Sequence, residues 1–472
     1  MIPLSLADIA KATGAVPDMI ADFDAVVDSV VIDSRKAGPG ALFAALPGQN
    51  VDGHDFAAAA VAAGAVAALA SRPAGVPALL TPDVPAARAT LARAVTDALP
   101  GLSIAGITGS VGKTTTKDLA AQLIERLGPT VAPQGSYNNE IGHPLTVLRV
   151  TEATRYLVLE LSARKAGDIA QLCEIAPPSL GVVLCVGHAH TGEFGGLAEV
   201  ARAKGELPAT LPATGTALLN CDDPRVLAMA ERTAARVVTF GRGREATVRA
   251  VDVRLDATGR AEFTLVTPEG SAPVGLRLVG EHNVTNALAA AALAGQLGLP
   301  VAEAAEALCA AVPRSRWRME VTERPDGVTV INDAYNANPE AMAAAIETLA
   351  VVARGRRAFA VLGPMAELGS ESQLRHEEAG GLAARSGVAG LIVVGEDAAP
   401  MLAGARAERS WRGELLSVPD AGSAVAALGN LLEPGDVVLV KASRSVGLER
   451  VALALTGEAA QRKGSWWRAR SP

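Results

Sequence analysis

The run GSVGKTT at residues 109–115 is the feature that most constrains how this chain can fold. It follows the apolar, strand-like segment Ser103–Thr108 and precedes a helical pattern. In a strand–loop–helix unit of this kind, the backbone N–H groups of the loop and the positive end of the helix hold the phosphates of a nucleotide. The run therefore predicts a nucleotide site inside an α/β domain.

The individual residues of this run have expected roles in binding ATP. Lys113 would reach the β- and γ-phosphates, and the Thr114 hydroxyl would ligate Mg²⁺. The other expected ATP-binding residues of the run are Gly109, Ser110, Gly112 and Thr115. The general motif has a further glycine five residues before Gly112, where this chain carries Ile107. A glycine-rich turn that caps a helix by chance is the alternative, and the flanking strand and helix favour the nucleotide site.

The distribution of strand-like and helical patterns divides the 472 residues into three regions. Residues 1–101 contain short strand-like runs and an alanine-rich stretch, 56–70, which we expect to form a core helix. In residues 102–313, apolar strands alternate with helical patterns, and residues 247–278 switch to the two-residue period of an antiparallel part. Residues 314–472 repeat the alternation. The sequence thus predicts an α/β fold with a small α/β domain, a central P-loop ATPase-like domain with a mainly parallel sheet, and a C-terminal Rossmann-like domain.

Composition and charge exclude several other classes of protein. The formal charge of −7, the lack of a basic block and the 3% of aromatic residues give no support to nucleic-acid binding. The first residues lack both a basic region and a long apolar run, and no stretch is apolar enough to span a bilayer, so we expect a cytoplasmic protein. Four scattered cysteines without CxxC spacing are typical of reduced thiols.

Several further motifs, in a fixed order, resemble those of the Mur ligase family. They are GSYNNEIGHPLT at 135–146, GEHNVTNA at 280–287, NDAYNANP at 332–339 and LGPMAELG at 362–369, with DSR at 33–35 and DGH at 52–54. The shortened phosphate loop is also the form that this family carries. The resemblance extends from about residue 30 to 450, and the YNANP run resembles the branch of the family that adds D-alanyl-D-alanine.

The resemblance implies an ATP-dependent ligase that joins D-alanyl-D-alanine to UDP-N-acetylmuramoyl-tripeptide for peptidoglycan synthesis. A free carboxylate forms no amide at neutral pH without activation, and ATP can supply that activation by converting the carboxylate to an acyl phosphate. The enzyme would then act mainly by positioning and charge neutralisation. ATP and two Mg²⁺ ions are the implied cofactors, and we expect a monomer.

A second magnesium site is implied at Glu160, His190 and Lys204. Glu160 ends the strand-like run 156–161, and His190 follows the run 180–186, so both lie at the carboxyl ends of parallel strands, where α/β folds bind ligands. A lysine repels a cation, but in this family the matching lysine is carbamylated by CO₂, which supplies an anionic oxygen ligand. With Lys113, these three residues are the expected catalytic set. A solvated Lys204 on a helix surface is the alternative.

The resemblance also implies the remaining binding residues. His282, Asn283 and Asn286 would bind the adenine side of ATP, Arg318 its phosphates and Asp333 the ribose, so the nucleotide would lie between the second and third regions, which would close around it. His282 alone could also be a capping or packed histidine, and we expect His188 to be a surface residue. The implied substrate-binding residues are Ser34, Arg35, Asp52, His54, Asn138, Asn139, Glu140, Tyr335, Asn336 and Asn338.

Four positions depart from the family pattern: Val111, Cys185, Ala341 and Pro364. They bear on substrate detail more than on the class of reaction. A sibling ligase that adds another amine, including a folylpolyglutamate-type enzyme, is the nearest alternative. A non-catalytic paralogue that uses ATP only as a conformational switch is the alternative from another class, and the candidates for a second metal site argue against it.

Overall fold

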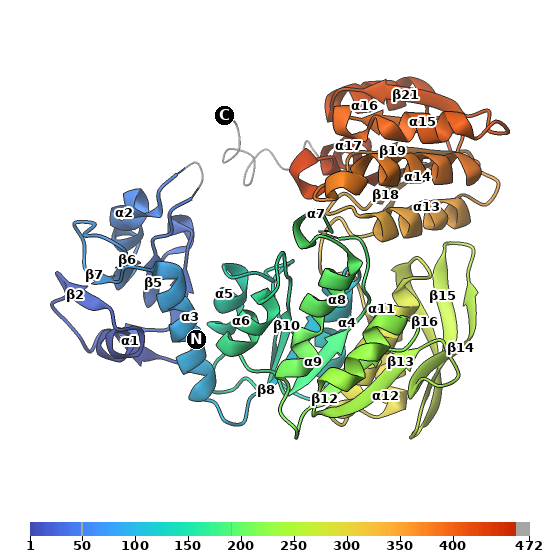
Figure 1. Cartoon of the computed structure of the whole chain (residues 1–472). Helices are drawn as coiled ribbons and strands as arrows, with labels where there is room; N and C mark the ends of the chain where they lie inside the picture. Colours follow the sequence, from blue (N-terminus) through green and yellow to red (C-terminus); the bar gives the residue numbers. More distant parts are fainter. Residues whose placement is uncertain (49–50, 190, 459–472) are drawn as a thin grey trace.

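The computed structural model describes residues 1–48, 51–189 and 191–458, which form three α/β lobes arranged along the sequence (Figure 1). Each lobe has its own sheet, with five, nine and six strands in chain order, and a further two-stranded sheet lies near the N-terminus. The predicted fold class is confirmed. Among the described residues, none of the helices has both the length and the apolarity that a membrane span requires.

The N-terminal sheet has the strand order β2-β7-β6-β5-β4, in which β4 to β7 are parallel and β2 is antiparallel. Its strands are β2 (Val16–Asp18), β4 (Ser29–Val31), β5 (Ala41–Ala44), β6 (Ala67–Ala70) and β7 (Ala78–Leu80), and β1 (Leu4–Ser5) pairs separately with β3 (Val26–Val27). The helices are α1 (Leu6–Thr13), α2 (Ala57–Ala62) and α3 (Val84–Asp97).

The predicted core helix over residues 56–70 is wrong in its second half. Helix α2 ends at Ala62, and the chain turns at Gly64, whose φ of +112° favours glycine. Residues 67–70 then form β6, which is buried throughout. A strand in a parallel sheet covered on both faces reads as a continuous apolar run, so an alanine run of this length does not distinguish strand from helix.

The nine-stranded central sheet carries the phosphate loop at its switch point. Its order is β16-β15-β14-β13-β12-β11-β8-β10-β9, so β8 lies between β10 and β11, where the direction of winding reverses. The strands are β8 (Ser103–Thr108), β9 (Thr130–Val131), β10 (Tyr156–Glu160), β11 (Leu180–Val183), β12 (Thr216–Asn220), β13 (Arg236–Gly241), β14 (Val248–Leu255), β15 (Arg260–Thr267) and β16 (Gly270–Val279). Strand β15 runs antiparallel to both β14 and β16, which confirms the predicted antiparallel part.

Helices flank this sheet. They are α4 (Lys113–Ile124), α5 (Gly142–Val147), α6 (Asp168–Ile175), α7 (Thr191–Phe194), α8 (Leu197–Lys204), α9 (Glu206–Thr210), α10 (Pro224–Leu227), α11 (Asn283–Gln296) and α12 (Val301–Ala310). Helix α11 packs on α4. The helix that follows the phosphate loop is therefore held in place by a helix from the C-terminal part of the same domain. Helix α7 reaches the C-terminal lobe (Figure 1).

The C-terminal sheet has the order β17-β18-β22-β19-β20-β21, with only β17 antiparallel among its described strands. The strands are β17 (Glu320–Glu323), β18 (Thr329–Asn332), β19 (Ala358–Leu362), β20 (Gly390–Val394), β21 (Glu414–Val418) and β22 (Val437–Lys441); the helices are α13 (Pro339–Ala353), α14 (Ser372–Arg385), α15 (Pro400–Ala407), α16 (Ala421–Leu431) and α17 (Glu449–Leu455). Alternate strand residues enter two separate apolar clusters, one on each face, as a doubly wound sheet requires.

Candidate active site

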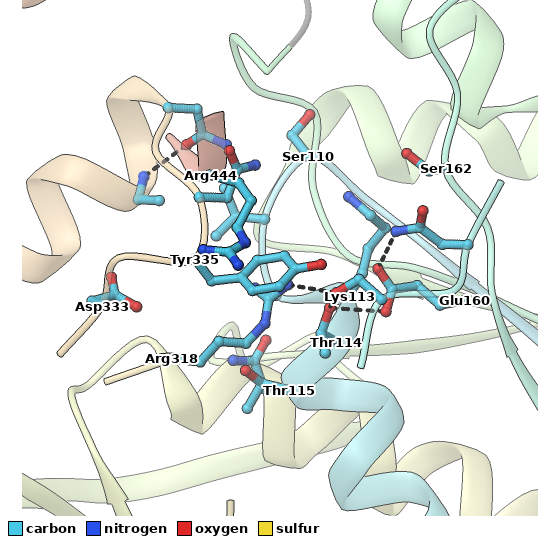
Figure 2. Close-up of a pocket in the computed structure, with 18 of the residues that line it drawn as sticks. Ser110, Lys113, Thr114, Thr115, Glu160, Ser162, Arg318, Asp333, Tyr335 and Arg444 are labelled. Atoms are coloured by element: carbon cyan, nitrogen blue, oxygen red, sulfur yellow. Dashed lines mark hydrogen bonds between the residues drawn. The ribbon is translucent and has the colours of Figure 1, made fainter. Parts of the chain in front are cut away.

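A cavity of about 1310 Å³ lies between the central and C-terminal domains. Many of the predicted site residues line it: Ser110, Gly112, Lys113, Thr114, Thr115, Asn138, Asn139, Glu140, Glu160, His282, Asn283, Asn286, Arg318, Asp333, Tyr335, Asn336 and Asn338. Figure 2 shows the phosphate loop facing Arg318, Tyr335 and Asp333 of the C-terminal domain. Segments separated by more than 200 residues therefore contribute to one site.

The phosphate loop has the backbone that its glycines permit. Gly112 lies in the left-handed region at φ +87°, and a Cβ there would stand 2.3 Å from the Asn286 amide oxygen, so no larger residue fits. Helix α4 begins at the next residue and directs its free N–H groups toward the cavity. The Lys113 amine donates to the carbonyl of Gly109, 2.6 Å away, and burial lowers its pKa. The loop thus places a cation and a helix N-terminus together, which is an anion-binding arrangement.

Glu160 ends β10 beside this loop and is almost fully buried, with 1% of its surface exposed. One carboxylate oxygen accepts a hydrogen bond from the Thr114 hydroxyl at 2.8 Å, and the other accepts one from the Asn138 amide at 2.7 Å (Figure 2). A hydroxyl and a carboxylate side by side next to a phosphate site are the hard oxygen donors that Mg²⁺ prefers. The described residues contain no group of three or more His, Cys, Asp or Glu side chains arranged to hold a metal ion, and His190 lies outside them.

Lys204, at the end of α8, is buried, which contradicts the solvated alternative, although it does not line the cavity. The pKa of its amine is lowered to about 7, mainly by burial and also by the nearby charge of Lys113, while Cys185 opposes the shift. The neutral amine is the form that reacts with CO₂, and a pKa near 7 leaves a substantial fraction of Lys204 in that form at neutral pH. The structure is therefore chemically suited to a carbamate at Lys204.

Two of the departures from the family pattern contact each other beside the phosphate loop. The backbone N–H of Val111 donates to the Cys185 sulfur at 3.4 Å, and the thiol lies 3.7 Å from the Val111 carbonyl. The small, polarizable Cys185 side chain thus accepts a hydrogen bond from this N–H group of the loop. The four cysteines are free thiols, as predicted.

The start of α11 forms the wall of the cavity behind the phosphate loop. Asn283 donates to the Val279 carbonyl at 2.9 Å, and Asn286 donates to Asn283 while accepting from Thr116 of α4. These two asparagines therefore fix the position of α4 as well as facing the cavity. His282 stands at the N-cap without a capping hydrogen bond from its side chain, so the capping alternative is wrong for this histidine.

The C-terminal domain contributes a cationic wall to the cavity. Arg318 donates to the Ser136 hydroxyl of the central domain at 2.8 Å and stacks over the Tyr335 ring, with 4.3 Å to the ring centre. The residues on either side of Arg318, Trp317 and Met319, have φ of +59° and +50°. Non-glycine residues adopt this conformation at a cost, so the surrounding structure holds Arg318 in a specific place.

Sequence reasoning missed three residues that line the cavity: Ser136 of the central domain, and Lys441 and Arg444 of the C-terminal domain. Lys441 forms an ion pair with Asp333, whose other oxygen accepts from the Met319 N–H at 3.0 Å. One available signal was that Lys441, one of only eight lysines, directly follows the apolar, strand-like run 437–440. Arg444 stacks over the Trp317 ring at 4.3 Å, a contact between segments that no sequence pattern links.

Some predicted substrate residues have structural roles. Asn338 caps α13 through its side-chain oxygen, which accepts from the Ala341 N–H at 2.9 Å. Asn139 accepts from the N–H groups of Ile141 and Gly142, at 3.3 and 3.0 Å, at the start of α5. Both line the cavity, so a second role in binding stays a prediction.

The four predicted residues of the N-terminal domain do not line this cavity. Arg35 pairs with Asp33 in the short helical turn that begins at Ser34. Asp52 accepts from the His54 ring at 2.6 Å and from Arg72 at 2.8 Å. These residues lie in another lobe, so their binding role stays a prediction.

His188 is not the surface residue that we expected from the sequence. Its side chain is 19% exposed and lies between the central and C-terminal domains, where its ring contacts Glu340 at 2.6 Å and Arg375 at 2.9 Å. No local pattern pairs these positions, because they come from different domains.

Family models match most of the chain. The Mur ligase family catalytic domain matches residues 26–102, the Mur ligase middle domain matches 107–294, and the Mur ligase glutamate ligase domain matches 317–444. The chain belongs to the Mur ligase family.

Named relatives refine this placement. A UDP-N-acetylmuramoyl-tripeptide–D-alanyl-D-alanine ligase of Mycobacterium tuberculosis is 49% identical over 97% of this chain and 98% of its own length. A protein of the same name from Escherichia coli is 38% identical over 92% of this chain and 94% of its own length.

Solved structures agree with these relatives. MurF from Acinetobacter baumannii superposes with a TM-score of 0.86 at 30% identity, covering 96% of this chain and 99% of that one. MurF from Thermotoga maritima in complex with ADP superposes with a TM-score of 0.78 at 30% identity, covering 92% and 99%.

Proposed function

We propose that this chain is an ATP-dependent ligase that joins D-alanyl-D-alanine to UDP-N-acetylmuramoyl-tripeptide and yields the pentapeptide used in peptidoglycan synthesis. The observation that carries the proposal is the shared cavity, where the phosphate loop and Arg318 of the C-terminal domain face each other. Full-length relatives named UDP-N-acetylmuramoyl-tripeptide–D-alanyl-D-alanine ligase support the choice of substrates.

In the proposed reaction the chain binds ATP with its γ-phosphate between Lys113 and Arg318. These two cations neutralise the charge that develops as the phosphoryl group passes to the tripeptide carboxylate. The acyl phosphate that results is attacked by the amine of D-alanyl-D-alanine, and phosphate leaves. Tyr335, Asn336 and Asn338 are proposed to position the dipeptide, and Asn138, Asn139 and Glu140 the tripeptide.

We assign one Mg²⁺ ion to Thr114. We assign the second to Glu160, His190 and a carbamate on Lys204. Bound there, Mg²⁺ would supply Lewis-acid neutralisation of phosphate charge. His282, Asn283, Asn286 and Asp333 are proposed to bind the nucleoside, and Ser34, Arg35, Asp52 and His54 the UDP group. We further propose that the chain acts as a monomer in the cytoplasm, where ATP is supplied.

The decisive experiment is phosphate release from ATP, with Mg²⁺ and the UDP-muramoyl tripeptide, in the presence and absence of D-alanyl-D-alanine. We expect release that depends on the dipeptide, with the pentapeptide seen by mass spectrometry, and a loss of at least ~10³-fold in Lys113→Ala. Release with another amine only would assign the chain to a sibling activity. ATP binding without release for any amine would indicate a non-catalytic paralogue.

The carbamate has its own test. We expect Lys204→Ala to be inactive at ambient CO₂ and to regain part of its activity when a small carboxylic acid is added, because the acid can supply the missing oxygen ligand. Lys204→Arg, which keeps the charge but forms no carbamate, should stay inactive without added acid. Full activity of Lys204→Ala without added acid would contradict the assignment.

A further inference from the structure

The segment 186–189, which follows β11, bonds to the phosphate loop on its central side. The Ser110 hydroxyl accepts from the Gly187 N–H at 2.8 Å and donates to the Gly187 carbonyl at 3.1 Å. The preceding N–H group, that of Val186, donates to Asp223 at 2.8 Å. A residue of the phosphate loop is therefore joined directly to the residue that precedes His188.

On its other side, the same segment bonds to the C-terminal domain. One carboxylate oxygen of Glu340 accepts from both the backbone N–H of His188, at 2.9 Å, and its ring Nδ1, at 2.6 Å. The other ring nitrogen, Nε2, lies 2.9 Å from an Arg375 N–H group. Arg375 is in turn oriented by Glu371 at 3.0 Å and Glu378 at 2.9 Å. The ring nitrogens thus face Glu340 on one side and, on the other, Arg375 and Glu371, whose carboxylate lies 3.8 Å from Nε2.

Glycines allow the two domains to approach closely here. A Cβ on Gly187 would stand 2.6 Å from the Glu340 carboxyl carbon, and one on Gly192 would stand 2.5 Å from the backbone nitrogen of Gly369. The N–H of Gly192 donates across the boundary to the Glu367 carbonyl at 3.1 Å. A side chain at Gly192 would thus hold the two backbones apart, and one at Gly187 would displace the Glu340 carboxylate.

We propose that His188 and Glu340 are positioning residues for the ligase reaction. Together with Ser110, Gly187 and Arg375 they form an interdomain clasp, which holds the C-terminal domain against the phosphate loop. Neither His188 nor Glu340 lines the cavity, so they act through other residues. Glu340 lies in the first turn of α13, two residues after Asn338, which does line it.

The clasp matters because the C-terminal cations must meet ATP that is bound mainly by the central domain. A charge-assisted hydrogen bond between the domains favours the closed arrangement over an open one, and Ser110 ties that bond to the loop that holds the phosphates. The inference rests on the proposed function for its kinetic readout only, because the arrangement of the domains can be measured without substrates.

The test compares Glu340→Ala with Glu347→Ala, a matched change at an exposed glutamate further along α13. For Glu340→Ala we expect a larger radius of gyration in small-angle X-ray scattering and a kcat/KM for D-alanyl-D-alanine lower by about tenfold. Glu347→Ala should match the wild type in both. Asn338 still caps α13 in the variant, so folding is expected to be retained, and a melting curve checks this.

His188→Ala provides the second arm, read as a double-mutant cycle with Glu340→Ala. The clasp requires that the double variant lose little more than either single variant, because both remove the same bond. Additive losses in the double variant would overturn the proposal. A change in activity without a change in scattering, or a change in scattering without a change in activity, would also overturn it. If the wild type shows no release that depends on the dipeptide, the proposed function fails, and the scattering comparison still decides whether the clasp exists.

Discussion

Toward the N-terminal domain, the central domain packs through an apolar core that continues across the boundary, whereas toward the C-terminal domain it is joined mainly by polar side chains. One buried cluster includes Leu6, Leu42 and Leu91 of the N-terminal region together with Leu157 and Leu172 of the central one. Helix α3 lies between them and packs against α1 on one side and α5 and α6 on the other (Figure 1).

The C-terminal side has a different chemistry. Apart from Val279, the members of the two C-terminal clusters come from residues 319–452. The contacts that cross this boundary include Arg318 with Ser136, His188 with Glu340, and the ion pair of Arg164 with Glu367 at 3.6 Å.

The difference predicts which boundary can open. Separating an apolar core exposes surface at about 25 cal/mol per Å², and nothing in water compensates for it. Separating hydrogen-bonded groups exchanges them for water at a net cost of only ~1 kcal/mol each. We therefore expect the closing motion at the C-terminal boundary, around the cavity, and a rigid N-terminal boundary.

The largest effect is expected for Leu91→Ala, in the middle of α3 and fully buried. Removing this side chain should lower the free energy of unfolding by ~3 kcal/mol, because it leaves a cavity in the shared core. Urea denaturation measures the change. Leu374→Ala, at a side chain that is 51% exposed in the C-terminal domain, is the matched control and should stay within ~0.5 kcal/mol. A loss below ~1 kcal/mol at Leu91 would show that the core does not continue across the boundary.

A slightly smaller effect, on activity alone, is expected for Arg318→Ala. We predict that kcat/KM falls ~10²-fold while the free energy of unfolding changes little, because this arginine bridges a polar boundary and supplies no core packing. Arg318→Lys should recover little activity, since an ammonium cannot both bond Ser136 and stack flat on Tyr335. Steady-state kinetics with Arg406→Ala, an exposed position, as control would detect this. If Arg318→Ala lost stability as well as activity, this would contradict the inference that the C-terminal boundary is polar and contributes no core packing.

The contrast also explains how far the sequence could predict this molecule. Strand β8, the phosphate loop and the strand end at Glu160 were predictable, because each follows from a local pattern of apolar runs, glycines and strand ends. The predicted domain limits at residues 101 and 313 stay predictions, as do the binding roles of individual residues. Cross-domain pairs such as Arg318 with Ser136 depend on how folded domains meet, which no local pattern encodes.

A moderate effect is expected for Arg88→Met at the N-terminal boundary. The Arg88 guanidinium is fully buried, burial lowers its pKa to about 10, and it donates to the Glu140 carbonyl at 3.2 Å, while its Nε and second amino group lack partners among the described residues. Methionine avoids burying a charge, so the free energy of unfolding should rise by ~1 kcal/mol.

The same change should lower kcat/KM a few-fold, because the segment that carries Asn138 and Glu140 loses its anchor to α3. Urea denaturation and steady-state kinetics would be run on the same preparation. A fall in stability would mean that ordered water satisfies the free N–H groups and that the arginine belongs to the boundary as a polar contact.

The smallest effect is expected for Asp52→Asn in the N-terminal domain, and it depends on pH. Hydrogen bonds from the His54 backbone, the His54 ring and Arg72 hold the pKa of the Asp52 carboxyl below its usual range. The folded chain therefore binds fewer protons here than the unfolded chain. The stability that this carboxylate contributes is present above the unfolded pKa of about 3.9 and is lost as the pH falls below it.

Asp52→Asn should consequently lower the melting temperature by the same small amount at pH 7 and pH 5, and by progressively less below about pH 4. Asp55→Asn, three residues further along and exposed, controls for introducing an amide into this turn. Circular dichroism melts across this range would show the trend. A difference that persists unchanged at low pH would mean that geometry rather than charge stabilises the turn, and the N-terminal lobe would then owe its stability to its apolar contacts alone.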